Sequence, residues 1–110
     1  MHVDRLDIPI VADRILIKVE SELETLMPRF LANRRRDLET IAQGLAVLDF
    51  ERLRKTGHDM KGVGGGYGFE RISDLGAAIE MAAARQDSGE LVSLMQQYGD
   101  FLSNVDVVYV

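Results

Sequence analysis

The chain of 110 residues contains no cysteine, which excludes disulfide bonds and thiolate metal sites. No apolar run approaches the roughly 20 residues that a membrane-spanning helix needs. The first residues, MHVDRLDIP, lack the charged-then-apolar pattern of a signal peptide. Internal repeats and low-complexity segments are also missing. Together these absences fit a reducing compartment, and we expect a cytoplasmic protein with no membrane partner.

The residues that are present have an ordinary globular composition, 46% hydrophobic and 28% charged. The length suits one domain with a single hydrophobic core. A net charge of −5 repels nucleic acid, so we expect no nucleic-acid partner. The one basic run, Arg34-Arg35-Arg36, is typical of a solvated helix face, and a local patch for phosphate or an acidic partner is the alternative.

Hydrophobic residues recur at helical spacing from about Leu23 almost to the C-terminus. Pro28 belongs in a first turn or a break, so we expect a short helix before it and a long one after it. Asp49 should cap a second helix that starts at Phe50, and Ser88 can cap the last one. The first long helix carries an apolar stripe made of Met27, Phe30, Leu31, Leu38, Ile41, Leu45 and Leu48.

Two further stripes indicate two more helices. The third helix presents Ile72, Leu75, Gly76, Ile79 and Ala83, and the fourth presents Leu91, Leu94, Met95, Tyr98, Leu102 and Val105. The connections between the stripes are only a few residues long, which favours antiparallel neighbours. The sequence therefore predicts an all-α protein, an antiparallel up-and-down four-helix bundle.

Two terminal segments do not follow the helical pattern. Residues 15–19 alternate in side-chain type, and residues 105–110 are rich in β-branched side chains. They could pair as a short two-stranded β-ribbon that ties the termini together, or form helix or coil packed on the bundle. We divide the chain into an N-terminal extension, residues 1–20, and a bundle domain, residues 21–110.

Residues 57–68, GHDMKGVGGGYG, place several glycines beside one of the two histidines. Each glycine inside a helix costs about 1 kcal/mol relative to alanine. Either the helix ends here, or something requires bare backbone beside the histidine. On a helical wheel the residues that face the core, at spacings of three and four, are Phe50, Leu53, Gly57, Met60 and Gly64. The two glycines of this buried stripe would let a neighbouring helix approach closely.

His58 lies on a different, polar face of the same helix. Its neighbours three or four residues away are Arg54, Lys55, Lys61 and Gly62, with Gly65 one turn further on. We expect the two glycines of this exposed face to clear space for another molecule to reach the imidazole. Gly66 and Gly68 should mark the helix end, where left-handed backbone favours glycine.

An exposed imidazole in this setting could carry a phosphoryl group. Its nitrogen is a nucleophile and is largely neutral at physiological pH. A phosphoryl group on the ring would be anionic, and Lys61 is positioned to contact it. An exposed contact of this kind is worth only about 0.2–1 kcal/mol, so it would hold the group without locking it in place.

The block His58-Asp59-Met60-Lys61-Gly62, followed by Gly68, Leu75 and Ile79-Glu80, resembles the histidine-containing phosphotransfer (HPt) domain. The resemblance extends from about Leu23 to Val105. It implies a four-helix bundle with the histidine exposed midway along one helix. It also implies phosphoryl transfer between that histidine and aspartates of response-regulator receiver domains, as in a two-component phosphorelay.

Carried over to this chain, the resemblance implies that His58 is the phospho-acceptor, Lys61 the phosphate-stabilising residue and Gly62 the residue that leaves room. Gly65, Arg54 and Lys55 complete the expected docking surface. The chain would be a phosphocarrier without enzymatic activity of its own and with no cofactor or metal, since the receiver supplies metal and carboxylates.

We expect as partners receiver domains, a hybrid histidine kinase or both, and a monomeric chain. One departure from the family is Val63-Gly64, where many members have a pair such as Ser-Ser or Ala-Ala. Val63 has a modest volume that the fold tolerates, but it offers no hydroxyl to a phosphate.

Two alternatives remain beside this reading. The phospho-acceptor bundle of a sensor histidine kinase also opens with a histidine and an acidic residue. Such motifs usually continue to a proline where this chain has Val63, and they need an ATP-binding domain for which 110 residues leave no room. A non-enzymatic helical interaction module would explain the buried glycines, but not Gly62 and Gly65.

Nucleotide and metal sites are not supported. The pattern G-x-G-x-x-G fails because its last position falls on Tyr67 or Phe69, and a Walker A loop lacks its Gly-Lys-Ser/Thr end. His58 and Asp59 are adjacent and point to different helix faces, so they do not form a metal site.

Overall fold

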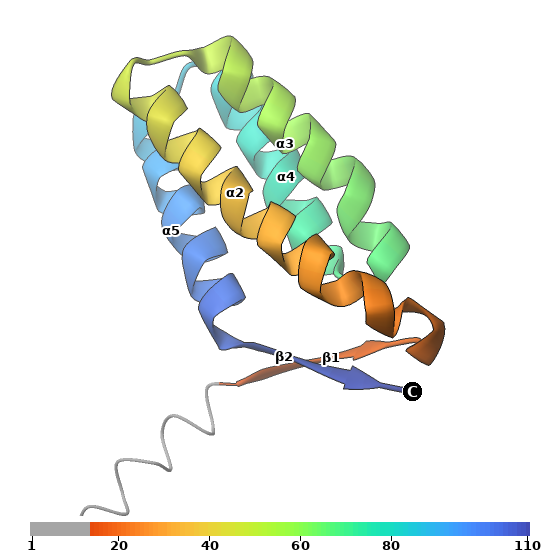
Figure 1. Cartoon of the computed structure of the whole chain (residues 1–110). Coiled ribbons are helices and arrows are strands. Elements are labelled where there is room, and N and C mark those ends of the chain that lie inside the picture. The colour runs from red at the N-terminus through yellow and green to blue at the C-terminus, as the bar shows by residue number, and fades with distance from the viewer. Residues whose placement is uncertain (1–13) are drawn as a thin grey trace, which may run out of the picture.

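The computed structural model describes residues 14–110 and consists mainly of four α-helices that run side by side (Figure 1). The elements in chain order are β1 (Ile15–Val19), the 3-10 helix η1 (Ser21–Leu26), α2 (Met27–Ala46), α3 (Phe50–Gly64), the 3-10 helix η2 (Gly65–Tyr67), α4 (Glu70–Ala84), α5 (Ser88–Asn104) and β2 (Val105–Tyr109). The predicted four-helix bundle is confirmed. Within the described residues, no helix has the length and apolar character needed to cross a bilayer.

Local capping chemistry sets where two of the helices begin. The Asp49 carboxylate accepts a hydrogen bond from the backbone N–H of Arg52 at 3.1 Å, which confirms the predicted cap of α3. At α5 the prediction was wrong by one residue. Asp87 has the non-helical backbone of a cap, with ψ of 88°, and accepts from the N–H of Glu90 at 3.1 Å, whereas Ser88 already lies inside the helix.

Pro28 lies in the first turn of α2, as predicted, where its missing N–H leaves no hydrogen bond unmade. The segment before it is a 3-10 helix rather than an α-helix. Leu48 was expected to end the apolar stripe of α2, but that helix stops at Ala46. Leu48 then adopts a φ of 53° and is 56% exposed, so the helical spacing no longer applies to it.

The inward faces of the helices form one continuous core. Its fully buried large side chains come from β1, from every helix of the bundle and from the residue just before α4: Val19, Met27, Ile41, Leu53, Met60, Phe69, Ile72, Leu75, Ile79, Leu91 and Tyr98. Val105, expected at the end of the last helix, instead begins β2 and is partly buried against this core.

The two terminal segments form a parallel ribbon at one end of the bundle (Figure 1). The register runs from Ile15 opposite Val105 to Val19 opposite Tyr109. This confirms the ribbon and excludes the helix-or-coil alternative for residues 15–19. The ribbon lies where the chain enters α2 and leaves α5, so it ties the segment before the first helix to the segment after the last one.

Candidate functional site

The exposed histidine lies midway along α3. Its side chain is 61% exposed, while Gly57 and Met60 on either side of it in the sequence are buried. The helical-wheel prediction that separated His58 from the core stripe is therefore confirmed. Because the stripe and the histidine occupy different faces, α3 can pack firmly and still present the imidazole to solvent.

Glycines allow α3 and α4 to approach until their backbones touch. A Cβ atom on Gly57 would lie 2.6 Å from both the carbonyl oxygen of Gly76 and the backbone nitrogen of Glu80. A Cβ on Gly76 would lie 2.5 Å from the backbone nitrogen of Lys61. Real Cβ atoms do not come so close, and backbone cannot move aside as a flexible side chain can. Both positions therefore require glycine, and the contact brings Glu80 beside His58.

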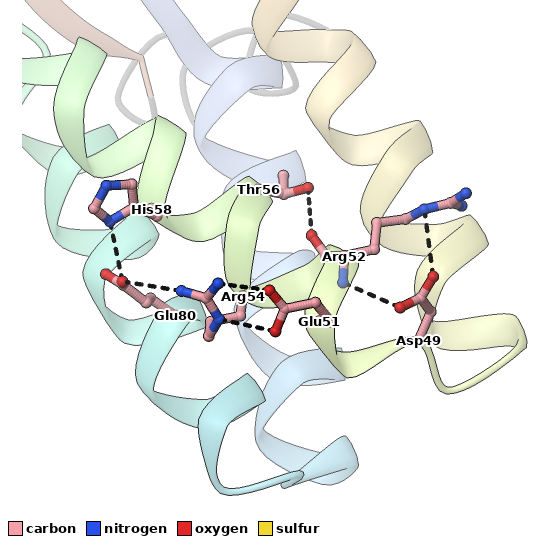
Figure 2. Close-up of polar contacts among 7 residues, drawn as sticks. All are labelled: Asp49, Glu51, Arg52, Arg54, Thr56, His58 and Glu80. Atoms are coloured by element: carbon pink, nitrogen blue, oxygen red, sulfur yellow. Dashed lines mark hydrogen bonds and ion pairs between the residues drawn. The ribbon is translucent and has the colours of Figure 1, made fainter.

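Glu80 of α4 is the centre of the polar cluster at the histidine. Its Oε2 lies 3.0 Å from Nδ1 of His58, and its Oε1 lies 2.9 Å from Nζ of Lys61. Figure 2 shows Glu80 reaching from α4 toward the ring, with Arg54 between Glu80 and Glu51. The hydrogen bond from Lys61, and then that from His58, lowers the pKa of the Glu80 carboxyl below its ordinary value.

This contact fixes which ring nitrogen is free. An ionised carboxylate can only accept hydrogen bonds, so Nδ1 of His58 must carry the hydrogen that Glu80 accepts. In a neutral imidazole the other nitrogen, Nε2, then holds the lone pair. The arrangement therefore presents the nucleophilic nitrogen on the side of the ring that points away from Glu80.

Two exposed glycines, Gly62 of α3 and Gly65 at the start of η2, leave open space one and two turns after His58. A Cβ on Gly62 would meet nothing within 4 Å, and one on Gly65 would meet only the hydroxyl of Ser73 at 3.7 Å. Their predicted exposure is confirmed. Of the two glycines expected at the helix end, Gly68 has the left-handed backbone, with φ of 85°, whereas Gly66 lies inside η2 without it.

The basic residues expected around the histidine differ in their surroundings. Arg54 is held by Glu51 at 2.6 Å and lies 4.0 Å from Glu80, and Lys61 is paired with Glu80. Lys55 is exposed on the same helix. The structure thus brings Arg54 and Lys61 together on one carboxylate, which neither was expected to contact.

The basic run of α2 is divided between two environments. Arg34 is largely buried: it pairs with Asp37 at 2.8 Å and lies over the ring of Phe30 at 5.0 Å. The hydroxyl of Tyr98 also donates to Asp37, at 2.9 Å. Burial raises the pKa of Asp37 even though both partners lower it. Arg34 therefore serves packing, while the next two arginines are exposed.

Glu80 is the site residue whose role the sequence analysis did not find. The signal for it was indirect. Gly76 was placed on the inward stripe of its helix, and Glu80 lies one turn after it. On the neighbouring helix, His58 directly follows the inward Gly57. Pairing the two glycines would have brought the carboxylate to the ring. Among residues 14–110, acidic and histidine side chains nowhere gather in a group of three that could hold a metal ion.

Comparison with protein families gives a match to the Hpt domain over residues 25–106, most of the chain. Searches of curated proteins and of solved structures gave no match. The matched region contains all four helices, His58 and Glu80. The chain therefore belongs to the Hpt domain family, the histidine phosphotransfer modules of two-component systems, which act as phosphocarriers rather than as catalysts.

Proposed function

We propose that the protein relays a phosphoryl group through Nε2 of His58, to or from an aspartate of a response-regulator receiver domain. The observation that carries this proposal is the pairing of an exposed imidazole with Glu80, whose Oε2 lies 3.0 Å from Nδ1. That pairing leaves Nε2 with its lone pair toward solvent. The same relay could receive its phosphoryl group from a hybrid histidine kinase through a receiver domain.

In the accepting step, the Nε2 lone pair attacks the phosphorus of an aspartyl phosphate. A P–N bond forms as the P–O bond to the aspartate breaks, and the electron pair of that bond returns to the carboxylate of the partner. The ring gains positive charge while Nδ1 keeps its proton, and the Glu80 carboxylate stabilises that charge. Transfer to another receiver reverses each of these changes.

Lys61 has a second task in this proposal. In the resting structure its Nζ lies 2.9 Å from Oε1 of Glu80 and is half exposed. A phosphoryl group on Nε2 would bring negative charge within reach of that flexible ammonium group. Because an exposed ion pair is worth only about 0.2–1 kcal/mol, Lys61 can exchange one oxygen partner for the other at small cost. The phosphorylated state is then stabilised without being trapped.

The docking surface of the proposal surrounds His58 on α3. Gly62 and Gly65 offer bare backbone on which a partner loop can lie, and Lys55 adds positive charge near an acidic receiver site. Arg54, held by Glu51, would act as part of the rigid frame of Glu80. A transient contact of this kind buries less than about 1,200 Å². We place this relay in the cytoplasm, as expected from the absence of cysteine.

The direct test is phosphoryl transfer from a panel of labelled receiver domains. His58→Gln should lose acceptance while its unfolding midpoint stays close to the parent value, because the ring is exposed. His2→Gln, at the other histidine, is the matched control and should accept label normally. Stoichiometric labelling of His58→Gln would refute the assignment. If no receiver or kinase labels the parent protein, the interaction-module alternative gains support.

A further inference from the structure

The terminal ribbon lies largely outside the region that the family shares. The match begins at residue 25, after β1, and ends at residue 106, near the start of β2. Two strands alone are marginally stable, and each strand of such a ribbon has an edge whose backbone groups lack a partner within the sheet. The ribbon is therefore an addition to the phosphotransfer bundle, and the backbone groups at its edges can form hydrogen bonds with a further strand.

The hydrogen-bond pattern identifies the groups at the outer edge of β2. Val110 donates to the carbonyl of Val19 at 2.9 Å and accepts from Ser21 at 3.0 Å, so its backbone groups face β1. Alternate residues of a strand point to opposite edges, so the backbone groups of Val107 and Tyr109 face away from β1. Among residues 14–110, these two residues carry the donors and acceptors of β2 that have no backbone partner.

The outer edge of β1 is not open in the same way. The carbonyl oxygen of Lys18 lies 3.4 Å from the place where a Cβ of Gly68 would be, so the loop after η2 packs against this edge. At the start of β2, Arg14 donates to the carbonyl oxygens of Val105 at 3.2 Å and Ser103 at 3.3 Å. The open edge is thereby limited to the last residues of β2.

The chemistry of this short edge suits an identical strand. Val108, Tyr109 and Val110 are 42%, 37% and 64% exposed, and β-branched and aromatic side chains favour strand pairing. The only charged residue of β2, Asp106, is neutralised by Arg14 at 2.7 Å. The side chains of β2 therefore bring no uncompensated charge to a pairing of two such edges.

We propose that the protein forms a reversible dimer in which β2 pairs antiparallel with β2 of a second copy, with Val108 at the twofold axis. Val107 of each copy then lies opposite Tyr109 of the other, and each such pair exchanges both of its backbone hydrogen bonds. A register centred on Val107 would instead place Tyr109 opposite Val105, whose carbonyl Arg14 already occupies.

The symmetry of this contact limits the assembly to two copies, and its small area makes the binding weak. An isologous pairing through one open edge closes at two copies and does not continue into a filament. Strands of this length bury well under about 1,000 Å², so the dimer is weak and dissociates on dilution. The proposal differs from the monomer expected from the sequence, because that expectation did not take into account the strand edge that is open among residues 14–110.

Sedimentation of the full chain over a concentration series tests the proposal. The average mass should rise with concentration, and Val108→Lys should raise the dimer dissociation constant at least about tenfold, because two lysines would face each other across the axis. Leu16→Lys is the matched control. It adds the same charge to the same face of the ribbon, on β1 at a residue that is 67% exposed, and should change the constant little.

A mass that stays monomeric at all concentrations would overturn the dimer, and so would equal weakening by both lysine variants. Amide exchange of the unaltered protein gives an independent test. Protection of the Val107 and Tyr109 amides should increase with protein concentration. Protection that is independent of concentration would mean that residues 1–13 of the same chain occupy the edge, and no protection would mean that it stays free. Either result contradicts the proposal.

Discussion

Two faces of α3 use the same amino acid for opposite purposes. At Gly57 a side chain would collide with the backbone of α4, whereas at Gly62 it would meet nothing within 4 Å. The first glycine allows two helices to touch, and the second leaves the space on the histidine's side of the helix open. A glycine in a helix can therefore indicate either close helix packing or open space for a partner, and the face that it occupies decides which.

The largest effect should come from filling the buried face. Gly57→Ala places a methyl group 2.6 Å from two backbone atoms of α4, so the helices must separate. We expect a loss of about 3 kcal/mol in the free energy of unfolding, at the upper end of the usual cost of overpacking. Urea denaturation measures it. An unchanged midpoint would show that the close contact between the helices is not needed.

Filling the exposed face with a large side chain should impair transfer instead of folding. Gly62→Leu would hold a partner away from Nε2 of His58, and a displacement of about 1 Å can cost about 100-fold in rate. The measurement is the rate of phosphoryl transfer from a cognate receiver domain. Gly89→Leu, at an exposed glycine of α5, is the control and should transfer at the parent rate. Equal rates for both variants would contradict the role of Gly62 in access.

A small side chain on the exposed face should change the free energy of unfolding in the opposite direction from one on the buried face. Gly62→Ala has room for its methyl group and restricts the unfolded chain, so it should stabilise the protein by about 0.5–1 kcal/mol. Urea denaturation beside Gly57→Ala gives a direct comparison within one helix. Destabilisation by Gly62→Ala would mean that its surroundings are less open than the structure indicates.

The smallest effect concerns pH. Lys61 and His58 lower the pKa of the Glu80 carboxyl from its ordinary value of 4.5. The contacts of this carboxylate therefore stabilise the fold fully only when the pH is above that ordinary value. That contribution is lost as the pH falls through the lowered pKa of the folded state. The difference in unfolding free energy between the parent and Glu80→Gln should therefore shrink below about pH 4.5. Burial raises the pKa of Asp37, so this residue contributes to the pH dependence of stability with the opposite sign. Taking the difference between parent and variant removes that contribution, because both proteins contain Asp37. A difference that grows on acidification would be inconsistent with this sign.

The sequence was sufficient for features that depend on local spacing. The bundle, the Asp49 cap and the face of each glycine in α3 follow from periodicity and backbone preferences, and all were found as predicted. The role of Glu80 could not be read in the same way, because it depends on how α3 and α4 approach each other. The direction of the ribbon is also set by the packed bundle, since strand propensity does not distinguish parallel from antiparallel pairing.

The ribbon has a consequence for the order in which the protein folds. Ile15 pairs with Val105, near opposite ends of the described chain, whereas each helix and each helical hairpin is built from contacts between residues close in sequence. Contacts between distant residues form only after the loss of chain entropy that brings them together has been compensated. We therefore expect the helices to assemble first and the ribbon to close last. In the folded protein it should be the first part to open, ahead of any loss of the helices that hold His58.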